Sequence, residues 1–312
     1  MKHAYLIIAH HEWEILRTLL TMLDDDRNDI YLHIDRRATA LMQQVDGLRL
    51  CHSPIHRIQQ PIETRWGNFS QVETELLLFE AALRNGPYAY YHLLSGVDLP
   101  LKSQDEIHQF FEENSELEFV EYLPEDVHAK ECRKRTMFYY VFNDQKKRQK
   151  DTRQALLTLN RNIILGLQKA LHIHRKPITS LRKGSNWVSI TQGFCEYLVS
   201  KQHSPAIRRF RYTLCPDELF VQTLLMASPF KDHIAQIAGG NARKIDWQRG
   251  SPYTWQDGDF EELINSDRLF ARKFSSADSR IIQRIYQHIM GETHDAKFCH
   301  TNTTIEKRNI DS

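Results

Sequence analysis

Two adjacent carboxylates, Asp217 and Glu218, stand in the stretch RYTLCPDELFVQ between a proline and an apolar run. An ionised carboxylate can accept a proton from a reacting hydroxyl, so a residue of this type can act as a general base. Pro216 suits the first position of a helix, and acidic residues in a first turn face the positive end of the helix dipole. The local sequence therefore predicts the start of a helix and leaves open whether Glu218 also does chemistry.

Two cations, Arg272 and Lys273, lie inside the apolar segment LFARKF. Fixed cations can hold a diphosphate and stabilise the charge that grows on it as it leaves. The flanking aromatic residues indicate that packing positions the pair. The alternative is a surface pair on a partly buried segment.

A divalent cation is another way to hold a diphosphate, and an Asp-x-Asp pair at the end of a strand can bind one. The triplet Asp257-Gly258-Asp259 has this spacing, but it follows YTWQ rather than a buried strand. Its residue types favour a turn and a helix cap. The sixteen histidines are scattered and form no HExxH pair. We therefore expect no metal site.

Polar residues follow three apolar runs, at positions 9–11, 33–36 and 95–98. Ligands of open α/β sheets bind at the carboxyl ends of the strands, so these three clusters predict a site. Neither GxGxxG nor GxxxxGK[ST] occurs, which argues against a Rossmann dinucleotide site and a P-loop. A carboxylate such as Asp35 can still accept a hydrogen bond from a ribose hydroxyl or a uracil N–H.

The apolar spacing predicts the elements that must position these groups. Expected strands cover residues 3–9, 29–34, 88–94, 118–122, 183–190 and 245–247. Expected helices cover residues 12–23, 71–83, 104–111, 152–170, 192–200 and 216–226. Alternating strands and helices predict an α/β fold with a mostly parallel central sheet flanked by helices, since parallel strands need crossover connections.

Composition fits this fold. With 41% hydrophobic and 26% charged residues, the chain is of the globular class. The net charge of +1 argues against a protein that coats nucleic acid. Five scattered cysteines without a CxxC pair indicate reduced thiols, and we expect a cytoplasmic location. The apolar run 4–9 is too short to span a membrane, so we expect a domain start without a signal peptide.

A basic stretch, residues 130–150, interrupts the pattern. Two interpretations of this stretch are open: a solvated basic loop and helix, or a mobile segment that contacts substrate. We expect one domain over residues 1–295, with a first half at about 1–125, the basic segment at about 126–150 and a second half at about 151–295. Residues 296–312 are polar and are expected to form a frayed tail.

Taken together, these segments resemble the core-2/I-branching enzyme family of glycosyltransferases, which includes β-1,6-N-acetylglucosaminyltransferases and is related to peptide O-xylosyltransferases. The resemblance spans about residues 3 to 274, in the family's order. It rests on the segments AYLIIAHHE, DIYLHIDRR, RWGNFSQVETELLLFEAAL, YYHLLSGVDLPLKS, GSNWVSIT, CPDELFVQTLL, RKIDW and LFARKF. It implies a GT-A-like fold, a UDP-sugar donor, inversion at the anomeric carbon and no metal requirement.

The resemblance also implies roles for single residues. By position, Glu218 in CPDE matches the catalytic base. Arg272 and Lys273 in FARKF match the residues that hold the UDP diphosphate in place of a cation.

The nucleoside pocket corresponds to Ala9, His10 and Asp35. Asn186 and Trp187 in GSNW fall near the donor sugar, where relatives often carry Asp instead of Asn, so the identity of the donor sugar stays open.

The donor-sugar and acceptor side corresponds to Ser95, Asp98, Arg133 and Arg135. N-acetylglucosamine is the expected donor sugar, with xylose, glucose or galactose as alternatives, and a glycan is the expected acceptor. An inactive sugar-nucleotide-binding protein on the same scaffold is the alternative outside enzymes. The chain looks like a bacterial member that builds surface polysaccharide, peripheral to a membrane rather than integral to it.

Overall fold

The computed structural model describes residues 1–123, 125–141, 152–237 and 240–291. Its strands are β1 (His3–Ala9), β2 (Asn28–Ile34), β3 (Ile55–Arg57), β4 (Tyr90–Ser95), β5 (Asp98–Pro100), β6 (Ser189–Thr191), β7 (Arg243–Ile245) and β8 (Phe270–Arg272). Its helices are α1 (Trp13–Met22), α2 (Thr39–Val45), α3 (Ser70–Leu83), α4 (Gln104–Glu113), α5 (Glu125–Thr136), α6 (Thr152–Ala170), α7 (Gln192–Ser200), α8 (Pro205–Arg208), α9 (Phe220–Met226), α10 (Phe260–Ile264) and α11 (Ser279–Met290). Single 3-10 turns cover Pro216–Glu218 and Asp257–Asp259.

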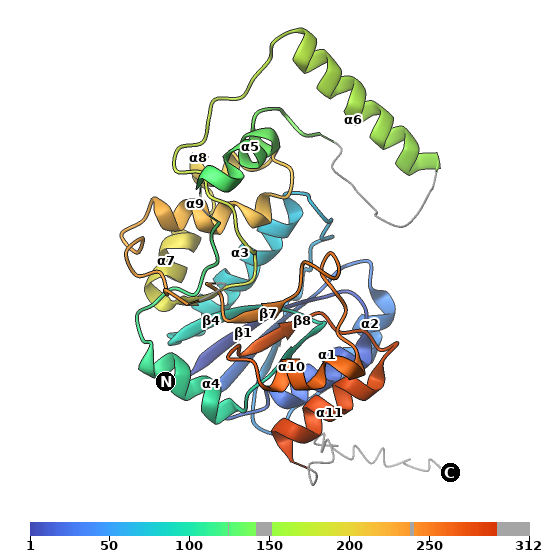
Figure 1. Ribbon diagram of the computed structural model, residues 1–312, viewed down its shortest axis with the longest axis vertical. Helices are drawn as coiled ribbons and strands as arrows, with labels where there is room; N and C mark the ends of the chain where they lie inside the picture. Colours follow the sequence, from blue (N-terminus) through green and yellow to red (C-terminus); the bar gives the residue numbers. More distant parts are fainter. Residues whose placement is uncertain (124, 142–151, 238–239, 292–312) are drawn as a thin grey trace, which may run out of the picture.

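The strands form two sheets. The larger sheet has the order β3-β2-β1-β4-β6, in which the first four strands are parallel and β6 runs antiparallel to β4. The smaller sheet has the order β5-β8-β7. The predicted α/β fold with a mostly parallel central sheet and flanking helices is confirmed (Figure 1).

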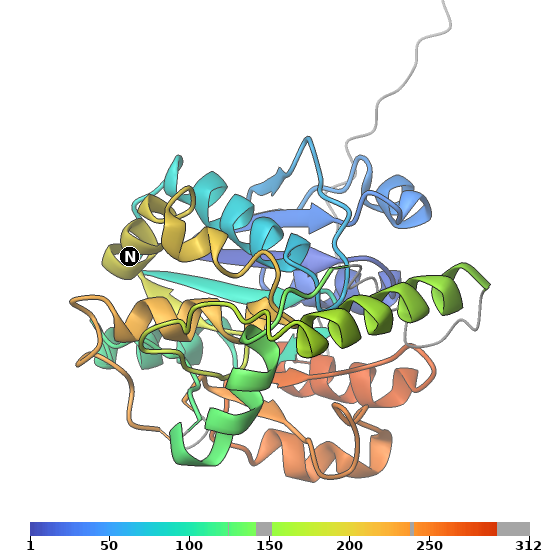
Figure 2. The same cartoon turned by 90° about the horizontal axis from the view of Figure 1, so that it is seen from above.

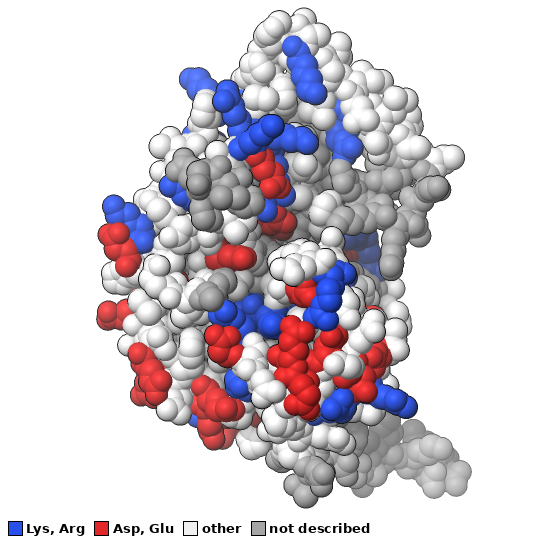
Figure 3. All heavy atoms as spheres, viewed as in Figure 1, with Lys and Arg blue, Asp and Glu red and all other residues white. Residues whose placement is uncertain are grey.

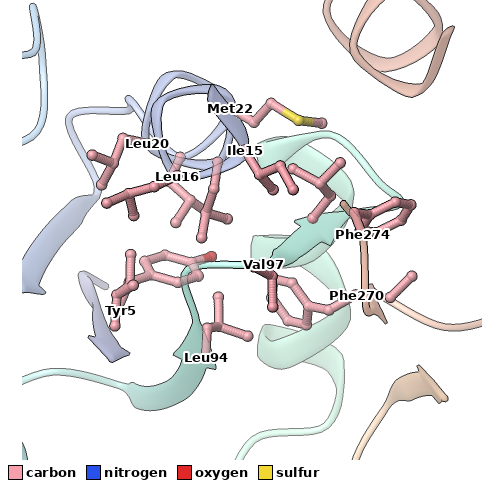
Figure 4. Close-up of a cluster of buried hydrophobic side chains, with 14 of the residues drawn as sticks. Tyr5, Ile15, Leu16, Leu20, Met22, Leu94, Val97, Phe270 and Phe274 are labelled. Carbon is pink, nitrogen blue, oxygen red and sulfur yellow. The ribbon is translucent and has the colours of Figure 1, made fainter. Parts of the chain in front are cut away.

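The central strand β1 supplies side chains to two hydrophobic cores, because successive residues of a strand point to opposite faces. Tyr5 and Ile7 pack in the core that includes α1 and α11. Leu6 packs in the core that includes α3, α7 and α9. This double burial explains the unbroken apolar run of the strand. Figure 4 shows the first core, with side chains of α1 facing Tyr5 and Phe270.

Helix α6 lies away from the two sheets, at the same end of the molecule as α5 (Figures 1 and 2). Helices α1 and α11 pack in one core of the larger sheet, and α3, α7 and α9 pack in the other. Within the described residues, no helix is long and apolar enough to cross a membrane.

Three predicted strands are wrong in part. Residues 118–122 form only isolated bridges, because Glu118 pairs with Ile234 and Phe119 pairs with Ser189. The expected strand 183–190 pairs only from Ser189, since the chain before it crosses closely over Glu121.

The third strand, expected at 245–247, ends at Ile245. The Asp246 carboxylate accepts hydrogen bonds from the backbone N–H groups of Gln248 and Arg249, and it thereby turns the chain. The predicted helix 216–226 is split into a 3-10 turn and α9 at Leu219, whose φ of −128° is not helical.

Candidate active site

The three polar clusters predicted at strand ends do meet at one edge of the larger sheet. The backbone N–H of Asp35 donates to Ala9, and that of Gly96 donates to Ile8. A Cβ atom at Gly96 would lie 2.8 Å from the Ala9 Cβ. The close approach of these two turns therefore requires glycine there.

Asp35 is buried directly after β2, and its carboxylate holds two neighbouring segments together. It accepts hydrogen bonds from the backbone and guanidinium of Arg37 and from the N–H of Thr64. Burial by itself would raise the pKa of Asp35, but these bonds outweigh it and the pKa is lowered. The observed role of Asp35 is to order the loop beside the strand ends. Its contact with a nucleoside stays a prediction.

His10 lies on the exposed bend that follows β1, with its ring 4.1 Å from that of His11. Loss of hydration, and then the charge of His11, lower the pKa of His10 to about 4, although Asp35 acts in the opposite direction. Asp35 and Arg272 are among the charges that act on it. The predicted nucleoside residues thus lie near the predicted diphosphate residue.

Arg272, at the end of β8, is held by residues of β4 and β5. It faces Asp98 in the register of β5 and β8. Its Nη1 lies 2.8 Å from the Asp98 carboxylate and also donates to the Ser95 hydroxyl. Its guanidinium lies 4.3 Å from the centre of the Trp187 ring. Packing and an ion pair therefore position the guanidinium, and its contact with a diphosphate stays a prediction.

Asp98 has only 1% of its surface exposed. Besides Arg272, it accepts hydrogen bonds from the N–H and the hydroxyl of Ser95. In this structure Asp98 and Ser95 orient Arg272. Their contact with donor sugar or acceptor stays a prediction.

Lys273 follows Arg272 and is half-buried. Its backbone carbonyl accepts a hydrogen bond from Trp255, which fixes the chain at this point. The second predicted diphosphate cation therefore adjoins the first on an ordered segment.

Glu218 ends the 3-10 turn that Pro216 begins. The residue before the turn, Cys215, has φ 47°, so the chain reverses sharply into it. Pro216 thus starts a helical turn as predicted, although α9 itself begins only at Phe220.

Two cations approach the Glu218 carboxylate. Arg135 on α5 donates to its Oε2 over 2.7 Å, and the Nζ of Lys183 lies 3.6 Å from the same oxygen. The side chain retains 29% exposure. No residue in the described parts of the chain donates to its Oε1. A fixed, partly exposed carboxylate with one open oxygen can accept a proton from a bound hydroxyl.

The loop 183–187 connects this carboxylate with the Arg272 site. Lys183 contacts Glu218 at one end, and Trp187 underlies Arg272 at the other. The N–H of Gly184 donates to the backbone carbonyl of Glu218. The predicted base and the predicted diphosphate cation therefore flank one ordered loop.

Two buried carboxyl groups lie behind this loop. Asn186 donates to Glu75 over 3.4 Å, and Glu75 interacts electrostatically with Asp217. Burial, followed by the charge of Glu218, raises the pKa of Asp217 to about 7. Burial raises the pKa of Glu75 well above its ordinary value, with Asp217 adding to the rise. Asn186 therefore contacts an acid, and its predicted contact with the donor sugar stays a prediction.

A cavity of about 550 Å³ opens between α5 and residues 174–183. Glu218 does not line it, but Lys183, which does, lies 3.6 Å from the Glu218 carboxylate, and we refer to it as the cavity beside Glu218. Its lining is largely apolar and includes Cys132 and Leu181. Arg133 and Lys183 also line it, and Lys183 contacts Glu218 as well. The two arginines predicted for the acceptor side therefore have different contacts: Arg133 lines the cavity, whereas Arg135 binds Glu218.

The Asp-x-Asp triplet forms a turn and helix cap, as predicted. Asp257 pairs with Arg284 and Asp259 with Arg249, so both carboxylates hold protein cations. The sequence has the same spacing in Asp24–Asp26, and there Asp24 accepts backbone hydrogen bonds from residues 51–53. Among the residues that the structure describes, no group of His, Cys, Asp and Glu could hold a metal ion.

Lys183, Glu75 and Asp217 were not predicted as site residues. Lys183 precedes the GSNW motif and Asp217 precedes Glu218, which were the available signals. No such signal marks Glu75, because it is one of several charged residues on a predicted helix. Residues 142–150 of the basic segment, and the tail 296–312, lie outside the described residues. No disulfide joins the cysteines within the described ranges.

Comparison with known proteins adds a family match. The model of the family described as Branch: Core-2/I-Branching enzyme matches residues 3–267. Xylosyltransferase 2 of Canis lupus familiaris is 24% identical over 311 residues, which cover 92% of this chain and 34% of that protein. Xylosyltransferase 1 of Rattus norvegicus is 24% identical over 282 residues, covering 84% of this chain and 32% of that protein. The chain thus spans about a third of the length of these relatives.

Among solved structures, apo mouse xyloside xylosyltransferase 1 aligns with 86% of this chain and 96% of its own, at 10% identity and a TM-score of 0.33.

Proposed function

Since the chain belongs to the core-2/I-branching enzyme family, we propose that it is a glycosyltransferase that moves a sugar from a UDP-sugar to a hydroxyl of a glycan acceptor. The family match covers most of the chain and most of the candidate site. The one predicted site segment outside the match is the end of β8 with Arg272 and Lys273.

Glu218 acts as the general base in this proposal. Its carboxylate takes the proton of the acceptor hydroxyl while that oxygen forms a bond to C1 of the donor sugar. The bond from C1 to the UDP oxygen breaks on the opposite face, so the reaction inverts the anomeric carbon. The carrying observation is the geometry of Glu218: Arg135 and Lys183 fix one oxygen, and the other accepts no hydrogen bond from described residues.

Arg272 and Lys273 stabilise the UDP diphosphate as it leaves. Asp98, Ser95 and the Trp187 ring hold the Arg272 guanidinium in place before substrate binds, and such fixed cations need little reorganisation during reaction. We therefore propose that the reaction needs neither a metal ion nor another cofactor.

The cavity beside Glu218 is the proposed acceptor site. It adjoins the base through Lys183, and Arg133 lies in its lining. Its open side would let a glycan chain extend into solvent, while its apolar wall would bind the less polar face of a sugar.

N-acetylglucosamine is the proposed donor sugar. Xylose is the second candidate, because the relatives named above are xylosyltransferases. We place the enzyme in a reducing compartment such as the cytoplasm, on the cysteine pattern, and in the synthesis of a bacterial surface polysaccharide.

A panel of UDP-sugars tests the donor and the metal requirement. UDP release is measured for UDP-N-acetylglucosamine, UDP-xylose, UDP-glucose and UDP-galactose, with EDTA or with Mn²⁺. We expect release with one donor and equal rates in EDTA, and thermal stabilisation by that donor. A strict need for Mn²⁺ would contradict the metal-independent mechanism. Absence of release and of stabilisation with every donor would contradict the proposed function.

Glu218→Gln tests the base. We expect the variant to bind UDP with unchanged affinity and to lose transfer by about 10²–10⁴-fold, because the amide cannot accept the proton. Glu113→Gln, on the exposed end of α4, is the matched control and should keep full activity. Transfer by Glu218→Gln at the wild-type rate would remove Glu218 from the mechanism.

A further inference from the structure

Helix α6 carries an apolar stripe that is exposed in the part of the chain that the structure describes. Leu156, Leu159, Ile163 and Leu167 are each more than half exposed, with 58%, 56%, 51% and 55% of their surface accessible. At 100° per residue these four positions fall within one narrow face of the helix, about 16 Å long. Leu171, just beyond the helix, is 66% exposed as well. A stripe of this size on a surface helix indicates a binding face.

The opposite face of α6 attaches the helix to the protein. Gln168 is buried, and its side chain exchanges hydrogen bonds with the backbone of Tyr139 in both directions. Arg161 is half-buried, and it lies about 160° around the helix from the centre of the stripe. The apolar stripe is therefore turned outward by specific contacts.

The charged residues of α6, and of the segment that follows it, are of one sign. Residues 152–195 contain no Asp or Glu. Their charged residues are Arg153, Arg161, Lys169, Arg175, Lys176, Arg182 and Lys183. Figure 3 shows white and blue side chains at the end of the molecule where α6 lies, and most red side chains in the opposite half.

We propose that α6 lies in the plane of an anionic lipid surface, with Leu156, Leu159, Ile163 and Leu167 inserted among the acyl chains and the neighbouring cations at the headgroups. A helix with an exposed apolar face, whose own charged residues are all Lys or Arg, has the pattern of interfacial helices. A second copy of the chain is a poorer occupant, because it would bring the same positive charge to the contact. The inference is independent of the proposed reaction.

This orientation has a consequence for the site. The cavity beside Glu218 is lined by α5, and α5 lies at the same end of the molecule as α6 (Figure 1). A protein docked through α6 holds that end, with the cavity, near the lipid surface.

Vesicle sedimentation with the full chain tests the proposal. The probes are vesicles of phosphatidylcholine alone and vesicles with one third phosphatidylglycerol, each at low and at 0.5 M salt. We expect binding to the phosphatidylglycerol vesicles, weakened at high salt because screening shortens the reach of charge. Leu159→Gln/Ile163→Gln should weaken binding more than tenfold. Lys169→Gln should weaken it roughly fivefold, since each cation near an anionic surface contributes about that factor.

Trp247→Gln is the matched control, because Trp247 is 58% exposed and lies outside α6. It should bind vesicles like the wild type. Circular dichroism should show all variants folded, since each changed side chain is exposed. Equal sedimentation of wild type and Leu159→Gln/Ile163→Gln would overturn the proposal. So would a wild-type dimer in solution that this double variant dissociates, because the stripe would then bind a second copy.

Discussion

Asp217 offers a test of how burial shapes the site next to Glu218. Its side chain is buried and interacts electrostatically with Glu75, and its Oδ1 accepts no hydrogen bond from the described residues. The Asp217→Asn variant keeps the size of the side chain and removes its ionisation. We expect this variant to gain stability relative to the wild type as pH rises.

The direction of this stability change follows from the pKa of Asp217. In the folded protein, burial and the charge of Glu218 raise the pKa of Asp217 from 3.8 to about 7. Between these values the unfolded chain has lost the proton and the folded protein retains it, so the wild type loses stability as pH rises. Each pKa unit corresponds to 1.36 kcal/mol, so the loss reaches about 4 kcal/mol by pH 7 and then levels off.

Urea unfolding at pH 4, 5.5, 7 and 8 measures this effect. The difference in unfolding free energy between Asp217→Asn and the wild type should grow by about 3 kcal/mol from pH 4 to pH 7, and only slightly more by pH 8. Asp232→Asn, at an exposed position, is the control and should show no such trend. A difference for Asp217→Asn that is the same at every pH would refute the reasoning, because it would mean that the carboxyl ionises alike in both states.

The other predictions concern Arg272 and Gly184. Arg272→Ala should lower stability by about 3–5 kcal/mol in thermal or urea unfolding, because it leaves Asp98 buried without its cation; Arg272→Ala/Asp98→Asn should recover part of that loss. If the double variant recovers stability but not UDP affinity, which calorimetry measures, the role of Arg272 in diphosphate binding is separate from its ion pair with Asp98. If the double variant recovers no stability, the ion pair does not stabilise the protein as inferred. Gly184→Ala should destabilise the protein by more than about 2 kcal/mol and reduce transfer, since its Cβ would lie 1.8 Å from the Glu121 carbonyl oxygen. Gly166→Ala, where nothing lies within 4 Å, should instead stabilise α6 by about 1 kcal/mol, and equal effects of the two substitutions would contradict the packing seen here.

The local sequence was sufficient to predict the bounds of elements that have a clear apolar pattern of their own. Helix α6 has the bounds 152–170 that its apolar spacing predicts, and α7 has the predicted bounds 192–200. Strand β1 was predicted at 3–9 because an unbroken apolar run fits a strand buried on both faces.

The local sequence did not predict the structure of segments whose backbone conformation depends on contacts with residues far away in the sequence. Residues 183–188 have strand-like composition, but Gly184 packs against Glu121 and donates to Glu218, so the segment runs as a loop. The strand expected at 118–122 is reduced to bridges because consecutive residues find different partners. These contacts have no signature in either segment alone.

For the candidate site, too, some features were predictable from the local sequence and others were not. The sequence by itself determined the α/β class, the polar clusters at the strand ends, the helical turn at Pro216 and the residue types Glu218 and Arg272. Only the tertiary structure decided their partners: Arg135 reaches Glu218 across 83 residues, and Asp98 reaches Arg272 across 174. The physical reason is that backbone pattern depends on neighbours along the chain, whereas the charge and exposure of a side chain depend on whichever segments fold against it.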